Sequence, residues 1–243
     1  MTLRKLSLRN IALIRPGIAV FCTLLAAPWA LAAESWQSAL AKMPLGGKVE
    51  ELNRSNCVSV MLGAFQSSDA VKALVFMPGA TDEFYMFKRA KARLTMGSPT
   101  LLDAVEALTN QTLIRVTFRP PLLLLHTDED PLEPVIRLRH EPTVRKLQRI
   151  LFPQHVLYND RDWDHLQPIL KKTFRVDVRP WRDAYDSWHF YRHSFAGWGL
   201  SGWEGLEAVA LAGKTCFTVE RGRLVFEGDE RVRATPKLDA FPR

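Results

Sequence analysis

Apolar side chains recur at helical spacing in two short stretches of the chain. In each stretch every third residue is apolar: Leu102, Val105 and Leu108 in the first, and Trp203, Leu206 and Val209 in the second. A spacing of three or four residues places side chains on one face of an α-helix. Both stretches therefore predict short amphipathic helices.

The same capping sequence precedes both predicted helices. Thr100 is followed three residues later by Asp103, and Ser201 is followed three residues later by Glu204. The hydroxyl accepts a hydrogen bond from a first-turn N–H, and the acid lies at the positive end of the helix. The two predicted starts are 201 − 100 = 101 residues apart.

An alternating strand follows each helix, and an apolar run follows each strand. The strands are predicted at 114–118 and 215–219, and the runs at 122–125 and 224–226. This order predicts a β-hairpin after each helix. With a shift of 101 residues, 71–128 overlies 172–229 without a gap; seven of 58 positions are identical, but turns and helix starts coincide. The pattern predicts an internal repeat.

Further elements precede each capped helix. We expect four of them in each half, in the order introductory helix, first strand, helix and extended stretch. In the first half they lie at 35–43, 57–62, 67–76 and 84–94. In the second half they lie at 143–152, 155–158, 164–174 and 188–195. Each half then has the order β-α-β-β-α-β-β. The predicted fold class is α+β, with two tandem small domains at 33–130 and 143–243 joined by a linker at 131–142.

The N-terminal segment 1–32 has the order of a secretory signal peptide. Basic residues precede an apolar run at 17–27, and small residues lie before a cleavage position after Ala32. The run has 11 residues, whereas a membrane span needs about 20. We expect general export to the periplasm or the medium, and no stable membrane span after cleavage.

Export also changes the net charge. The whole chain has 33 basic and 26 acidic residues, a formal charge of +7, and 1–32 contains four basic and no acidic residues. The mature chain then carries 33 − 4 − 26 = +3. The remaining charges are mixed in sign, with one dense basic patch at 88–93. The sequence therefore does not indicate a nucleic-acid partner.

No residue pattern indicates a metal or cofactor site. His189 and His193 could share a metal on a helix, but their aromatic-rich segment predicts a strand, in which residues four apart are separated by about 13 Å. The segment 160–164 resembles the opening of a calcium loop, but His165 and Lys171 stand where that loop needs glycine and glutamate. We expect an acidic helix start there.

Candidate catalytic residues also lack their partners. Neither Ser194 nor Ser201 lies in a Gly-x-Ser-x-Gly elbow, and Ser201 is expected to cap a helix. The glycines at 197–205 precede no phosphate-loop lysine and are expected to turn the chain between strand and helix. Cys57 and Cys216 have the apolar neighbours of buried thiols, and the sequence leaves open whether they pair.

The first capped helix and its turn have a pattern found in a known family. Leu101, Ala104-Val105 and Leu108 form the helix pattern, and Asn110-Gln111-Thr112 forms a polar turn. The second copy, 201–226, matches the helix and hairpin. These segments resemble the short N-terminal domain of secretins and TonB-dependent receptors, although Leu113 stands where that family has glycine. The resemblance implies a periplasmic docking or assembly module without catalytic residues.

Aromatic and basic side chains form the remaining candidate for function. We predict an interaction surface that contains Trp181, Tyr185, Trp188, Tyr191, Arg192, Lys88, Arg89 and Lys91. Such side chains suit a protein partner. The alternatives are core packing for the aromatic residues and a solvated strand face for the basic ones.

Together these features predict a non-enzymatic protein of the cell envelope. We expect an exported adaptor of a secretion or outer-membrane complex, which presents sheet edges and the predicted surface to an envelope protein. The alternative is a secreted hydrolase or carbohydrate-binding protein that uses the aromatic-rich second half. The sequence leaves the oligomeric state open.

Overall fold

The structure is a computed structural model that describes residues 34–53, 55–77, 91–95, 97–126, 141–160, 163–180, 193–213, 215–220 and 223–228. The predicted signal peptide and cleavage position lie outside these residues. The described part of the chain forms one compact unit and is not divided at the predicted linker.

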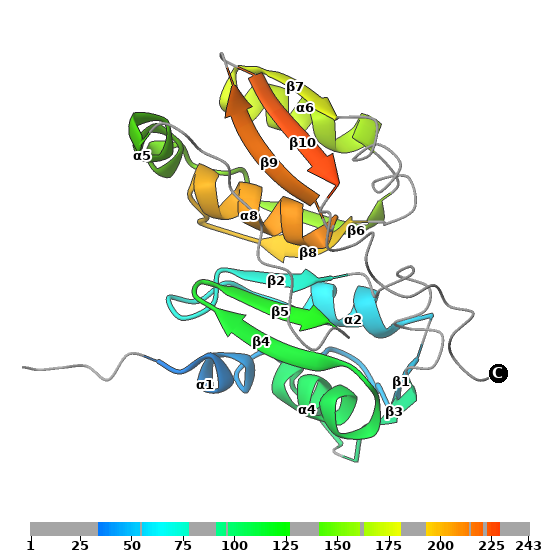
Figure 1. Cartoon of the computed structure of the whole chain (residues 1–243). Helices are drawn as coiled ribbons and strands as arrows, with labels where there is room; N and C mark the ends of the chain where they lie inside the picture. The colour runs from blue at the N-terminus through cyan, green and yellow to red at the C-terminus, as the bar shows by residue number, and fades with distance from the viewer. Residues whose placement is uncertain are drawn as a thin grey trace, which may run out of the picture. The chain divides into compact units, whose positions relative to one another are not determined.

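Both halves contain the same order of elements (Figure 1). The first half consists of α1 (Trp36–Leu40), β1 (Glu51–Asn53), α2 (Cys57–Ala64), β2 (Ala73–Phe76), β3 (Lys91–Arg93), α4 (Leu101–Gln111), β4 (Arg115–Arg119) and β5 (Leu122–His126). The second consists of α5 (Glu141–Arg149), β6 (His155–Asp160), α6 (Trp163–Phe174), β7 (Asp177–Pro180), β8 (His193–Gly197), α8 (Gly202–Ala212), β9 (Thr215–Glu220) and β10 (Arg223–Gly228). The α+β class is confirmed, and each half follows β-α-β-β-α-β-β after an introductory helix.

Two predicted elements of the first half are wrong. The predicted strand 57–62 is helix α2, whose buried residues include Cys57, Val58, Met61 and Leu62. The predicted helix 67–76 ends in strand β2, in which every residue is buried. A strand covered on both faces is a continuous apolar run without alternation, so its pattern resembles a buried helix.

The strands of the two halves pair according to the same scheme. In the first half β1 pairs antiparallel with β3, β2 pairs parallel with β5, and β4 pairs antiparallel with β5. In the second half β6 pairs with β8, β7 with β10, and β9 with β10, in the same orientations. The two halves therefore share one topology, although few of their residues are identical.

The shift between the halves changes along the chain. Glu51 pairs with Arg93, as His155 pairs with Gly197, so the shift there is 155 − 51 = 104 residues. From α4 and α8 onward it is 202 − 101 = 101. The connection before α8 is correspondingly three residues shorter than the one before α4. The ungapped alignment is therefore right for the capped helices and hairpins and wrong by three residues for the strands before them.

A five-stranded sheet joins the two halves. Its order is β4-β5-β2-β8-β6, and β2 pairs antiparallel with β8 from Phe76 opposite Ser194 to Ala73 opposite Gly197. The other strands form a three-stranded sheet, β7-β10-β9, and a pair, β1-β3. The predicted domains 33–130 and 143–243 thus share a sheet.

The core lies on both faces of the five-stranded sheet. Leu74 and Phe76 face a cluster that includes α2 and α4, whereas Ala73 and Val75 face a cluster that includes α5, α6 and α8. Successive strand residues point to opposite faces. Strand β2 is therefore covered by the first half on one side and by the second half on the other.

Both predicted helix caps are confirmed. The Asp103 N–H donates to the Thr100 hydroxyl at 3.3 Å, and the Thr100 N–H donates to the Asp103 carboxylate at 2.7 Å. Ser201 and Glu204 make the same two bonds at 3.3 and 2.7 Å. The reciprocal bonds fix where α4 and α8 begin.

The glycines around α8 have two roles. Gly199 has φ +64° and turns the chain between β8 and α8, as predicted. Gly205 lies within α8 instead, where an added Cβ would stand 2.1 Å from the Phe152 ring. The prediction that these glycines turn the chain between strand and helix is therefore wrong for Gly205, which allows Phe152 to contact the helix backbone.

Candidate functional site

Most of the predicted interaction surface lies outside the described residues. This applies to Trp181, Tyr185, Trp188, Tyr191, Arg192, Lys88 and Arg89. Lys91 is described: it is exposed on β3, and its amine lies 3.4 Å from Oε2 of Glu51. The structure therefore places one of the eight residues, in an ion pair across the β1-β3 pair.

The candidate nucleophiles have structural roles. Ser194 is 1% exposed on β8, where its backbone pairs with Phe76 of β2. Ser201 caps α8, as expected. The Ser194 side chain is buried, and the Ser201 hydroxyl accepts a hydrogen bond from the Glu204 N–H.

The structure describes only some of the candidate metal ligands. His193 begins strand β8, as the predicted strand requires, while His189 lies outside the described residues. His165 is an exposed residue of α6. Within the described ranges, no three histidine, cysteine or acidic side chains lie close enough to hold one metal ion.

Cys57 and Cys216 are both buried, and they form no disulfide with each other. Cys57 lies in the first-half core, with Sγ 3.9 Å from Sδ of Met61. Burial raises the pKa of the Cys57 thiol to about 12 because the thiolate would lose its hydration. Since the thiolate is the reactive form, Cys57 is inert near neutral pH.

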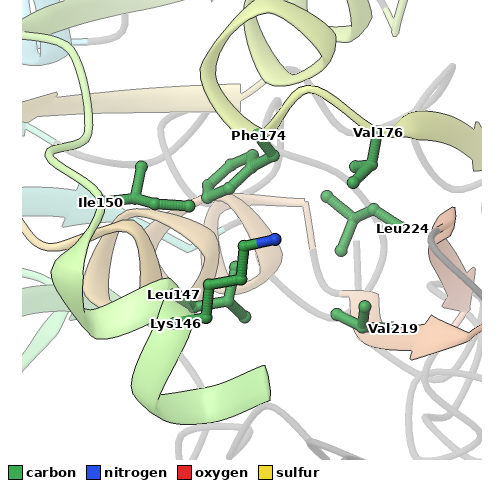
Figure 2. Close-up of a pocket in the computed structure, with 7 residues that line it drawn as sticks. All are labelled: Lys146, Leu147, Ile150, Phe174, Val176, Val219 and Leu224. Carbon is green, nitrogen blue, oxygen red and sulfur yellow. The ribbon is translucent and has the colours of Figure 1, made fainter. Parts of the chain in front are cut away.

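An apolar pocket lies in the second half, which we call the α5 pocket (Figure 2). It has a volume of about 180 Å³. Helix α5 and the turn after it form one wall, the end of α6 and the residue just before β7 form another, and β9 and β10 form the third. The lining residues are Lys146, Leu147, Ile150, Phe174, Val176, Val219 and Leu224.

Among the described residues that line the α5 pocket, Lys146 is the one that is ionisable. Figure 2 shows its amine directed into the space between Phe174, Leu224 and Val219. Among the described residues, Lys146 has no ion-pair or hydrogen-bond partner. An ammonium group beside apolar side chains suits a ligand that has an anionic end and an apolar body.

Sequence reasoning missed the α5 pocket, although the alignment of the two halves contained one signal for it. With the shift of 101 residues, Val219 corresponds to Phe118, so a large side chain in the first half is a small one in the second. The position of Lys146 carried no signal, because Lys146 is one of several basic residues in the predicted helix 143–152.

An ion pair connects the two halves beside the shared sheet. Nη2 of Arg119, at the end of β4, lies 3.2 Å from Oε1 of Glu207 on α8. The Glu207 side chain is 12% exposed and that of Arg119 is 35% exposed. The partial burial makes this contact more resistant to screening by salt than a surface pair.

Comparisons with known proteins identify no relative of this chain. No protein family matches the chain, and no curated protein or solved structure is significantly similar to it. Among the described helices, none is both long and apolar enough to cross a membrane.

Proposed function

We propose that this chain is an exported, non-enzymatic adaptor of the cell envelope that binds a protein partner through an edge of its central sheet. The export step rests on the N-terminal segment 1–32, with its basic start, apolar run and small residues before Ala32. The resemblance to secretin and receptor N-terminal domains supports a docking role. The observation that supports the binding step is that one edge of strand β4 has no strand partner within the described residues.

Strand β4 is the most suitable edge for an added strand. It ends the order β4-β5-β2-β8-β6, so one of its edges has no strand partner within the described part of the chain. All five residues of β4 are exposed or half-buried. An extended partner segment could therefore pair with its backbone and contact its side chains.

The other edge strands are less suitable for pairing, and two of them, β1 and β3, have only three residues each. The register of β6 against β8 shifts between Leu157 and Asp160, which interrupts a regular ladder. Strand β7 ends at Pro180, which has no N–H to donate. In β9, the residues from Thr215 to Thr218 are buried.

Site-specific photo-crosslinking in the native envelope fraction tests the proposal. A photoreactive amino acid replaces Arg115, an exposed residue of β4, and Glu106, an exposed residue of α4, serves as the matched control. We expect a crosslinked protein at position 115 that is absent or much weaker at position 106. Recovery of the chain alone at both positions would refute the adaptor role, and equal crosslinking at both would refute the role of β4.

A further inference from the structure

Comparison of the α5 pocket with the corresponding region of the first half shows how the pocket arises. Gly202 N–H donates to the Ile150 carbonyl at 2.7 Å, as Leu101 N–H donates to the Met43 carbonyl at 2.7 Å. The introductory helices therefore correspond with a shift of 150 − 43 = 107 residues. This shift places Lys146 at the position of Ala39 in the first half, which is 2% exposed.

The space that is open in the second half is filled in the first. Phe118, which corresponds to Val219, packs against the first-half core, and its ring lies 6.4 Å from the Trp36 ring. In the second half valine replaces that phenylalanine, and Thr143 occupies the sequence position that corresponds to Trp36. The second half therefore combines a smaller side chain on β9 with a lysine where the first half has alanine.

The geometry points to a binding site for a small carboxylic acid with an apolar tail of about six carbon atoms. An apolar cavity of about 150 Å³ is known to hold benzene, and the α5 pocket measures about 180 Å³. The apolar walls would bury the tail, and the Lys146 ammonium would pair with the carboxylate. This inference does not depend on the proposed adaptor role, because the α5 pocket and the edge of β4 are separate features.

The size and chemistry of the site set the expected affinity and selectivity. A ligand this small with one ion pair should bind with a dissociation constant of about 0.1 to 1 mM. Hexanoate should bind more tightly than hexan-1-ol, which lacks the charge, and hexylamine should bind least because its ammonium group would face that of Lys146. A pocket that recognised only the six-carbon tail would bind all three compounds with the same affinity.

Titration of the full chain with these three compounds tests the inference. Methyl labels on isoleucine, leucine and valine place NMR reporters in the walls at Leu147, Ile150 and Val219. We expect saturable shifts of these signals with hexanoate. Lys146 is an exposed residue, so the Lys146→Met variant should bind hexanoate about two- to fivefold more weakly and lose the preference over hexan-1-ol, whereas Lys172→Met, at an exposed lysine of α6, should behave as the unchanged chain.

A second variant tests the shape of the site. Val219→Phe reproduces the side chain of the first half, and it should abolish hexanoate binding while the protein remains folded. Failure of hexanoate to produce saturable shifts would overturn the inference. Equal binding of hexanoate and hexylamine, or unchanged hexanoate affinity in folded Val219→Phe, would also overturn it.

Discussion

Replacing Gly205 with alanine should destabilise the protein, although alanine is the better helix former. Gly205 lies inside α8, and an alanine Cβ would stand 2.1 Å from Cδ2, 2.2 Å from Cγ and 2.8 Å from Cβ of Phe152. Phe152 is 2% exposed, and its ring lies 6.3 Å from that of Phe174. The ring therefore has little space into which it could move.

Two opposing effects determine the size of the change. Alanine gains about 1 kcal/mol over glycine in a helix interior. Overpacking a filled core costs about 1 to 3 kcal/mol and occasionally more, and the three short contacts place Gly205→Ala at the upper end. The expected net loss in the free energy of unfolding is about 2 kcal/mol, which lowers the melting temperature by about 4 to 8 °C for a chain of this size.

Urea unfolding followed by circular dichroism measures this loss, and Gly63→Ala is the matched control. Gly63 also lies in a helix, α2, but an added Cβ there would meet no atom within 4 Å. Gly63→Ala should therefore raise stability by about 0.5 to 1 kcal/mol. The opposite signs separate the effect of packing from that of helix propensity.

The Phe152→Ala background isolates the contact. Phe152→Ala alone should cost about 3 to 5 kcal/mol. In that background Gly205→Ala should cost about 1 to 2 kcal/mol less than in the unchanged chain, because the two closest ring atoms are gone and only the contact with Cβ of residue 152 remains; this difference is the coupling energy. If Gly205→Ala raised stability in the unchanged chain as much as Gly63→Ala does, the close packing of Phe152 on α8 would be wrong.

Three further predictions concern the caps, the buried thiol and the ion pair between the halves. Thr100→Ala and Ser201→Ala should each lower the free energy of unfolding by about 1 kcal/mol in urea titrations, because each removes a capping box; no loss in either variant would contradict its cap. In a variant with both Cys22→Ser and Cys216→Ser, which leaves one cysteine of the three, the Cys57 thiol should react with Ellman's reagent at pH 8 only after unfolding, since a pKa of about 12 leaves almost no thiolate. Rapid reaction of the folded protein would show that Cys57 is accessible. Arg119→Met and Glu207→Gln should show a coupling of about 1 kcal/mol in a double-mutant cycle that persists at high salt, and additive losses would mean that the ion pair contributes nothing.

The capped helices and hairpins of both halves could be predicted from sequence because their signals are local. Thr100 and Asp103 form a capping box within four residues, and the alternation in 114–118 indicates a strand without information from elsewhere in the chain. The repeat could also be predicted, since turns and helix starts are preserved when side chains in the core change.

The central sheet could not be predicted in the same way. Whether 73–76 is a strand depends on β5 and β8, which supply its hydrogen bonds, and on two cores that cover both its faces. The three-residue difference in the connection before each capped helix could likewise not be predicted from sequence, because it follows from the strand registers. The α5 pocket depends on the side chain at Val219 together with an amine from Lys146, and no local pattern links those two positions.

The pairing of β2 with β8 has a consequence for the order of events during synthesis. Phe76 and Ser194 are 194 − 76 = 118 residues apart in sequence. Strand β8, which completes the central sheet, is therefore synthesised long after its neighbour β2. Until then β2 has an unpaired edge, and one apolar face of β2 and β5 lacks its cover. Contacts of such separation form slowly, and an exposed apolar strand edge attracts other chains. A nascent chain that stops after β5 should therefore associate with chaperones or with itself, and release should follow the arrival of α8.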